Sequence, residues 1–394
     1  MTHKEKAYLY WLITIDGIGP KAIGTLRKYV GSAEAVYGLN RHDLSWFLSP
    51  AQLDGLLKSR SHFDVEAEYA KLRKQGMAFY PYGDKSYPEK LIYIPDPPAA
   101  VFVRGTLPVA TQAAVALIGT RKCSGYGSAM AKQLGRMLAD AGVQVVSGMA
   151  RGIDGIGQRA VCEAGGATFA VLGCGADVVY PQESEDLYHM IIARGGVISE
   201  YIPGTGPSSG HFPARNRIIS GLSDVVVVVE AKEKSGTMIT VDMALEQGRD
   251  VYALPGRLVD GLSAGCNRLI RQGAGLIYSL DEFVADIVEG HRQKIEAEMI
   301  ALKKSTNLKT KQCKTQPAGN APPMPQSAAP SAMSSAEKLI FSGLDYAPRS
   351  LEEIAALCPG LGREEVLRGL ITFCLKGFAS QMGAGNYCRN DTYY

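Results

Sequence analysis

The 394-residue sequence has almost no excess of charge of either sign, since 42 lysines and arginines oppose 39 aspartates and glutamates. A uniformly basic surface for nucleic acid is therefore excluded. The sequence also lacks an apolar run of the roughly eighteen residues that span a bilayer. Its N-terminus shows no export signal. We expect a cytoplasmic protein that does not enter a membrane.

The sequence is equally poor in metal-binding and redox patterns. Its eight cysteines form no Cys-x-x-Cys pair, and no histidine stands at metal-ligand spacing. We expect reduced thiols, no metal and no cofactor. Cys123 lies in a glycine-rich loop, but spacing assigns no histidine to it, so a cysteine nucleophile is not predicted.

Composition and apolar spacing divide the chain into five segments. In residues 1–80 the apolar residues recur at helical spacing. Residues 81–112 contain too many prolines for a helix and include one candidate for an extended strand, AAVFVRG. Residues 291–334 are first basic and then rich in Pro, Ala and Ser, which predicts a linker. Residues 335–394 read as helix, helix and glycine-tipped hairpin, which is typical of a winged helix.

The central segment, residues 113–290, alternates short apolar runs with amphipathic stretches. Runs such as AVALIG, VQVVSG and DVVVVVE are apolar at most successive positions and do not alternate regularly with polar residues, so both faces of their sheet must be covered. This alternation predicts an α/β fold, a Rossmann-like, doubly wound, mostly parallel sheet. Because the segment holds 15 basic and 19 acidic residues, any bound anion must be held by a few local cations.

Four loops that follow strands of this sheet could supply those cations. ALIGTRKCSGYG carries Arg121, SGMARGID carries Arg151, and FPARNR carries Arg215 and Arg217, while KSGT offers hydroxyls and amides. Loops after parallel strands emerge at one edge of the sheet. We therefore expect the four arginines to form one site for a phosphate-bearing ligand.

Less specific explanations exist for the same loops. The first could be only a tight turn, and a dinucleotide site is disfavoured because the spacing departs from G-x-G-x-x-G. Asp154 is expected to cap a helix rather than act as an acid. The Gly17–Gly19 hairpin is like that of helix-hairpin-helix modules, but it is also a simple link between helices.

The motifs between Gly119 and Ala274 closely resemble the DNA-processing protein A family of natural transformation, also called DprA or Smf. They include GTR-x-x-S-x-YG, SG-x-ARGID, FPARNRIISGLSD and VVEA-x-x-x-SGT-x-IT. The resemblance implies a homodimeric mediator, not an enzyme, with a sterile-alpha-motif-like N-terminal domain. It would bind and protect single-stranded DNA, and load the RecA recombinase onto strands covered by single-strand-binding protein.

The resemblance also implies which residues contact the strand. They are small or polar residues of the four loops and one phenylalanine: Gly119, Thr120, Arg121, Ser124, Gly148, Arg151, Gly152, Phe212, Arg215, Asn216, Arg217, Ser235, Gly236 and Thr237. The implied dimer surface is Leu269, Ile270, Leu276 and Ile277, although the sequence equally allows ordinary core packing there.

The sequence departs from the family pattern after SG-x-ARGID. Gln158 stands where the family usually has histidine, which puts any role of that histidine in doubt. Gly155 and Gly157 replace alanines and are expected to be tolerated, at about 1 kcal/mol of helix stability each.

The main alternative is an enzyme like the lysine-decarboxylase-like nucleotide phosphoribohydrolases. Their P-G-G-x-G-T-x-x-E loop corresponds here to KSGTMIT, in which Thr240 replaces the glutamate expected to act on the ribosyl bond. We therefore do not expect catalysis. The winged-helix segment holds six basic and seven acidic residues, so we expect an accessory rather than a groove-reading role for it.

Overall fold

A computed structural model describes residues 1–312, 335–345, 349–375, 378–381 and 386–389. The chain separates into two compact units, one formed by Met1 and residues 66–314, the other by residues 2–65 and 315–394. Every cysteine in the described ranges is a free thiol. None of the helices described is long and apolar enough to cross a membrane.

The N-terminal residues form short helices around a small core. Gly17, with a φ of 80°, turns the chain between the first two of them, and the Gln52 side chain donates to its carbonyl over 2.7 Å. Trp11 and Leu26 are fully buried at their centre. The helices are α1 (His3–Ile13), α2 (Pro20–Val30), α3 (Ala33–Gly38), α4 (Arg41–Leu44), α5 (Pro50–His62) and, in the other unit, α6 (Val65–Lys74).

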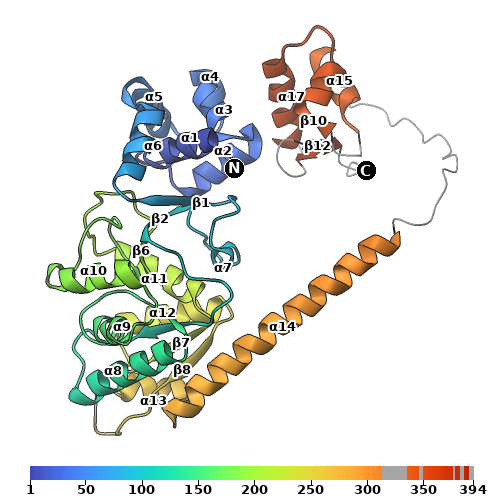
Figure 1. Ribbon diagram of the computed structural model, residues 1–394. Helices are drawn as coiled ribbons and strands as arrows, with labels where there is room; N and C mark the ends of the chain where they lie inside the picture. Colours follow the sequence, from blue (N-terminus) through green and yellow to red (C-terminus); the bar gives the residue numbers. More distant parts are fainter. Residues whose placement is uncertain (313–334, 346–348, 376–377, 382–385, 390–394) are drawn as a thin grey trace. The chain divides into compact units, whose positions relative to one another are not determined.

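A nine-stranded sheet organises the larger unit, with the order β1-β2-β6-β5-β4-β3-β7-β8-β9 (Figure 1). All pairs from β6 to β9 are parallel, which confirms the predicted Rossmann-like sheet. The strands are β1 (Ala78–Pro81), β2 (Ala100–Gly105), β3 (Ala114–Ile118), β4 (Gln144–Ser147), β5 (Thr168–Val171), β6 (Gly196–Ser199), β7 (Val225–Val228), β8 (Asp250–Ala253) and β9 (Gly275–Leu276).

The segment expected to be a connector, residues 81–112, contributes to this sheet. Its extended stretch is β2, which pairs antiparallel with β6, and β1 pairs antiparallel with β2. Val101, Phe102 and Val103 are fully buried. Burial on both faces therefore incorporates β2 into the sheet, while the prolines of this segment lie outside β2, most of them around the short helix α7 (Glu89–Ile92).

Helices cover both faces of the sheet, as the continuous apolar strands predicted. One hydrophobic cluster packs α8, α9 and the start of α14 (Leu280–Gln312) against the sheet through residues such as Leu134, Val161 and Phe283. Another packs α7, α11, α12 and α13 through residues such as Ile218 and Val241. The helices are α8 (Gly125–Asp140), α9 (Ile153–Glu163), α10 (Glu185–Arg194), α11 (His211–Leu222), α12 (Gly236–Glu246) and α13 (Ala264–Arg271).

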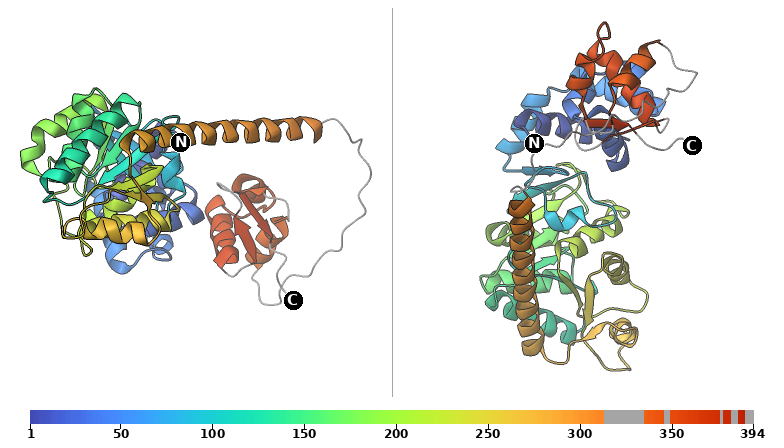
Figure 2. Two further views of the ribbon diagram at one scale, coloured as in Figure 1. Left: turned by 90° about the horizontal axis from the view of Figure 1, so that it is seen from below. Right: turned by 90° about the vertical axis from the view of Figure 1, so that its right-hand side faces the viewer.

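Helix α14 (Leu280–Gln312) occupies the basic segment that was expected to begin a linker at residue 291. Its first turns are anchored because Val284 and Ile287 are buried, and because His291 and Lys294 lie 3.6 and 3.8 Å from the Asp224 carboxylate. Figure 2 shows one unbroken helix that starts beside the sheet and continues past it. The rest of the predicted linker, 313–334, lies outside the described residues.

The described C-terminal residues have the element order of a winged helix. Phe341, Leu370 and Phe373 form their core. A capping box between Ser350 and Glu353 begins the middle helix. The elements are α15 (Ser335–Gly343), β10 (Arg349–Ser350), α16 (Leu351–Ala356), α17 (Arg363–Leu375), β11 (Ala379–Gln381) and β12 (Asn386–Arg389), and the strands pair antiparallel.

Candidate functional site

The strand order of the sheet reverses between β3 and β7. From β3 the chain adds β4, β5 and β6 on one side, and then returns to place β7 on the other side. Ligands of open α/β sheets bind outside the carboxyl ends of the strands at such a point. An open pocket of about 680 Å³ lies there, and its lining includes Gly119, Thr120, Arg121, Phe212, Arg215, Asn216, Ser235, Gly236 and Thr237.

A smaller cavity of about 60 Å³ adjoins this pocket. It shares Arg121, Phe212 and Arg215 with the large pocket and adds Gly148 and Arg151. The structure thus brings together most of the residues expected at the site. Ser124, Gly152 and Arg217 line neither cavity.

Arg121 is the exposed cation of the pocket. The loop that carries it begins at Gly119, where a Cβ would lie 2.6 Å from Ile153 Cγ1, so only glycine lets β3 approach α9 this closely. The Arg121 guanidinium carbon lies 5.7 Å from the centroid of the Phe212 ring. Among the described residues no carboxylate pairs with it. Arg121 is therefore available to a bound anion.

A carboxylate occupies the start of α8. In dinucleotide-binding Rossmann folds the corresponding helix start binds the pyrophosphate. The buried Glu230, at the end of β7, accepts from the Ser124 amide at 2.8 Å and from its hydroxyl at 2.6 Å. A Cβ at Gly127 would lie 2.4 Å from Glu230 Oε2. Ser124 thus has a structural bond, and Glu230 leaves no room for a phosphate at α8.

The start of α12, in contrast, is open. Ser235 is its N-cap but makes no side-chain capping bond. The Ser235 hydroxyl is buried and has no hydrogen-bond partner among the described residues. Among the described residues, nothing beyond the chain neighbours and the backbone of α12 itself lies within 4 Å of the position that a Cβ on Gly236 would take. The free amides of this helix start and the Ser235 hydroxyl can therefore bind an anion in the pocket.

Arg215 forms the inner wall of the pocket and is itself buried. It donates to the carbonyl of Gly148 at 3.1 Å and to the carbonyl of Val171, which ties together the ends of β4 and β5. Burial lowers the pKa of Arg215 to about 10, although Asp154 opposes this shift. A Cβ at Gly148 would lie 2.2 Å from the guanidinium, so this glycine makes room for it.

Asp154 is not the helix cap that the sequence indicated. The N-cap of α9 is Gly152, whose φ of 75° favours glycine and whose Cβ would lie 2.3 Å from the Thr120 carbonyl. Asp154 instead turns inward and accepts from the Gly148 amide at 3.2 Å. Burial raises the pKa of Asp154, whereas Arg215 lowers it. The carboxylate therefore supports the neighbouring loops and Arg215.

The other two arginines of the predicted site have carboxylate partners. Arg151 is exposed and pairs with Glu183. Arg217 forms a two-bond pair with Glu200 at 2.7 and 2.6 Å, and also donates to the Asp96 carbonyl. Residues two positions apart on a helix point in roughly opposite directions. Arg217 therefore faces away from the pocket that Arg215 lines, and the four arginines do not form one cluster.

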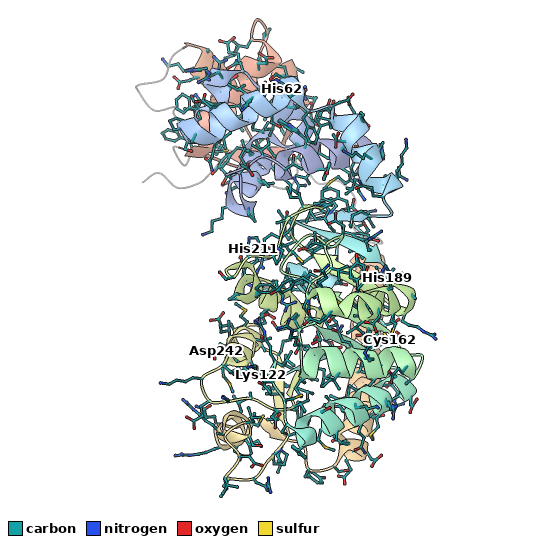
Figure 3. All side chains as sticks on the ribbon, turned by 90° about the vertical axis from the view of Figure 1, so that its left-hand side faces the viewer. His62, Lys122, Cys162, His189, His211 and Asp242 are labelled. Atoms are coloured by element: carbon teal, nitrogen blue, oxygen red, sulfur yellow. The ribbon has the colours of Figure 1, made fainter. Side chains whose placement is uncertain are left out.

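Aromatic rings line the pocket beside Arg121. Phe212 lies 5.2 Å from the ring of Tyr180, which is 40% exposed and also lines the pocket. His211 stacks on Tyr201 with ring centroids 4.0 Å apart. In Figure 3, His211 and Lys122 lie on the same side of this unit. Sequence reasoning missed Tyr180, although an aromatic residue directly before Pro181 in the loop after β5 was a usable signal.

Gln158, which replaces the usual histidine, lies in the interior and not in the pocket. Its side chain accepts from the Met149 amide at 2.9 Å and donates to Thr168 Oγ1 and the Phe169 carbonyl. Its role is to join β4 to β5. Gly157, which was expected only to be tolerated, is needed for close packing, because a Cβ there would lie 2.3 Å from Leu117 Cδ2.

The residues expected at a dimer surface divide between the core and the surface. Leu269 and Ile277 are buried in the hydrophobic clusters of the sheet, and Ile270 packs partly against one of them. Leu276, on the edge strand β9, is 46% exposed. A dimer formed at this edge stays a prediction, with Leu276 as its most accessible member.

Comparison with known proteins extends these observations. Residues 78–288 match the family model described as DNA recombination-mediator protein A. DNA processing protein DprA of Bacillus subtilis is 39% identical over 241 residues, which cover 59% of this chain and 81% of that protein. Protein Smf of Synechocystis is 30% identical over 403 residues, covering 99% of this chain and 100% of the relative.

A solved structure agrees with the sequence matches. The X-ray structure of DNA processing protein A from Streptococcus pneumoniae aligns with a TM-score of 0.62 at 36% identity, covering 71% of this chain and 97% of that one. The family match spans the sheet and every loop that lines the pocket. The chain therefore belongs to the DNA recombination-mediator protein A family.

Proposed function

We propose that this protein binds single-stranded DNA without sequence preference in the pocket between β3 and β7. The open start of α12 supports this most directly, because Ser235, Gly236 and Thr237 line a pocket that also holds Arg121, and the buried Ser235 hydroxyl has no hydrogen-bond partner among the described residues. Together they suit a phosphate. The rings of Phe212 and Tyr180 suit bases, which stack on aromatic side chains whatever their sequence.

Further members of the proposed site act through their neighbours. Gly119, Gly148 and Gly152 keep the backbone close enough for the loops to meet, and Arg215 holds two of the strand ends. Thr120, Asn216 and Thr237 line the pocket with polar groups. Ser124 and Arg217 are the members that geometry supports least, because their side chains are bonded to Glu230 and Glu200.

The wider role that we propose follows from family membership. The protein would protect incoming strands in the cytoplasm and help to load the RecA recombinase onto strands covered by single-strand-binding protein during natural transformation. We also propose a homodimer at the β9 edge, where Leu276 and Tyr278 are 46% and 73% exposed.

Binding without catalysis is the form of this proposal that the pocket supports. Asp154 carries the only carboxylate among the residues that line it, and that group is bonded to the backbone and faces Arg215. Acid–base catalysis on a ribosyl bond needs a carboxylate that can reach the substrate. Thr240, at the position of the glutamate in the phosphoribohydrolases, supplies none.

The decisive variant is Arg121→Ala. We expect intact protein to bind oligo-dT more tightly than matched duplex in a filter-binding assay, with affinity that falls as salt rises. Arg121→Ala should lose about tenfold or more of this affinity, equivalent to about 1.4 kcal/mol, with an unchanged unfolding midpoint because the side chain is exposed.

The neighbouring Lys122→Ala is the matched control, since it removes an exposed cation that does not line the pocket. It should lose less affinity than Arg121→Ala. Duplex preference, or equal binding by Arg121→Ala and intact protein, would place the site elsewhere. Release of free base from nucleoside monophosphates at a protein-dependent rate would instead establish the enzyme alternative.

A further inference from the structure

A second groove adjoins the proposed site and overlaps the SG-x-ARGID motif at Ala150, Arg151 and Gly152. It has a volume of about 350 Å³, and its lining includes Ser128, Lys132, Gly152, Ile156, Arg159 and Leu187. These residues belong to α8, to α9 with its N-cap, and to α10. The three helices lie side by side along one side of the sheet unit in Figure 1.

The groove meets the pocket region at Ala150 and Arg151. Both residues line this groove and also the small cavity beside Arg121, and Ala150 lines the large pocket as well. The three hollows therefore form a continuous surface. A chain that leaves the pocket past Arg121 reaches Arg151 next and then enters the groove.

The charge of this groove differs from that of the acidic domain around it. Its lining holds three cations, Lys132, Arg151 and Arg159, and one carboxylate, Glu163. Glu163 faces Arg136 at 3.7 Å, outside the lining. Outside the lining, Glu183 pairs with Arg151 and Asp186 pairs with Arg159, so among the described residues the unpaired positive charge of the groove is that of Lys132.

Lys132 is the most available of these cations. It is exposed on α8 and makes no ion pair with any described residue. Arg159 pairs with Asp186 at 2.8 Å, but both side chains are partly or largely exposed, so this pair contributes little and can exchange for a phosphate. No carboxylate other than Glu163 among the lining residues opposes a polyanion.

From this continuity and charge we infer that the groove holds the phosphates of nucleotides next to the one in the pocket. Lys132 is the principal contact and Arg159 the second. The inference rests on the proposed function, because it extends the same strand beyond the pocket. Contacts to phosphates alone add affinity without sequence preference.

The test compares oligo-dT of about four nucleotides, which fills the pocket, with one of about twenty nucleotides that also reaches the groove. In the full-length chain, Lys132→Ala should lower affinity for the long strand about three- to fivefold and leave the short strand unchanged. The slope of log affinity against log salt on the long strand should shrink by about 0.7, as expected when one phosphate contact is lost.

Lys74→Ala is the matched control. Lys74 is an exposed lysine on α6 in the same unit but lines neither the pocket nor the groove, so both affinities should stay unchanged. Alanine is favourable on an exposed helix surface, so Lys132→Ala should retain its fold. Lys132→Glu should lose more affinity for the long strand than Lys132→Ala.

Each outcome separates the groove from the pocket. If Lys132→Ala lowers the affinity for both strands equally, the proposal that the groove binds phosphates is refuted. It is also refuted if the affinity and the salt slope on the long strand stay unchanged. If Arg121→Ala abolishes binding of both lengths while Lys132→Ala changes neither, only the groove is refuted. If Arg121→Ala binds normally, the proposed function itself is refuted.

Discussion

Two pairs of arginines on the same sheet show how differently one residue type can be used. Arg121 and Arg151 lie in loops after β3 and β4, and both are exposed. Arg215 and Arg217 lie on α11, where one is buried and the other has a side chain only 12% exposed. The loop pair can meet a ligand, whereas the helix pair is already bonded to the protein.

The difference follows from what surrounds each guanidinium. Arg215 has the ends of β4 and β5 in reach, and their carbonyls accept its hydrogen bonds. Arg217 has Glu200 and the Asp96 carbonyl. A buried charge must be paired in this way or it destabilises the fold. The exposed loop arginines bear no such requirement: no carboxylate among the described residues pairs with Arg121, and Arg151 has only an exposed pair with Glu183.

Arg215→Met should give the largest effect, which is a loss of stability. The substitution removes the positive charge that favours the buried Asp154 carboxylate, and leaving a buried charge uncompensated costs about 3–5 kcal/mol. Urea unfolding followed by circular dichroism measures this. The double variant Arg215→Met, Asp154→Asn should recover part of the loss, because no charge is then left buried alone. A stable Arg215→Met protein with weakened DNA binding would make Arg215 a ligand contact instead.

Arg217→Ala should also act on stability, but less. It removes two charge-assisted bonds to Glu200, so we expect a loss of about 1.5–3 kcal/mol in the free energy of unfolding. The affinity for oligo-dT should change less than twofold at temperatures where the variant is folded. Glu200→Gln is the matched control and should reproduce the stability loss. A tenfold loss of DNA affinity without a stability change would return Arg217 to the binding site.

Glu183→Gln should give the smallest effect, and it should raise the affinity for DNA rather than lower the stability. It releases Arg151 from an exposed pair, and such pairs contribute at most about 1 kcal/mol, so affinity for oligo-dT should rise up to about fivefold. Glu185→Gln removes a nearby carboxylate that does not pair with Arg151 and serves as the control. A fall in affinity would show that Arg151 depends on Glu183 for its position.

The sheet was predictable because its signal is local. Runs such as Val225–Val228 are apolar throughout, and the glycine that follows β3 marks the turn into the next loop. Even so, AAVFVRG was recognised only as an extended stretch of a connector, because its partner in the sheet, β6, lies almost a hundred residues later. The start of α14 was missed for a similar reason, since Asp224 holds it from a distance in sequence.

The site was predictable only as a set of loops. Sequence order and the parallel sheet placed Arg121, Phe212 and Ser235 at one edge, because all parallel strands end on the same side. Nothing local indicated that Glu230 would occupy the start of α8 through Ser124, because 106 positions separate the two residues. The Lys132 groove also needs three helices to form, and no motif includes Lys132 or Arg159.

The sequence by itself determined the Rossmann-like sheet, the loops at its carboxyl edge and the residue types they carry, since these depend on periodicity and strand direction. Only the tertiary structure decided which polar groups are already paired. A guanidinium or hydroxyl is available to a ligand when no carboxylate or carbonyl of the fold lies within hydrogen-bonding reach. That condition separates Arg121 and Ser235 from Arg217 and Ser124, and it depends on contacts between residues far apart in the chain.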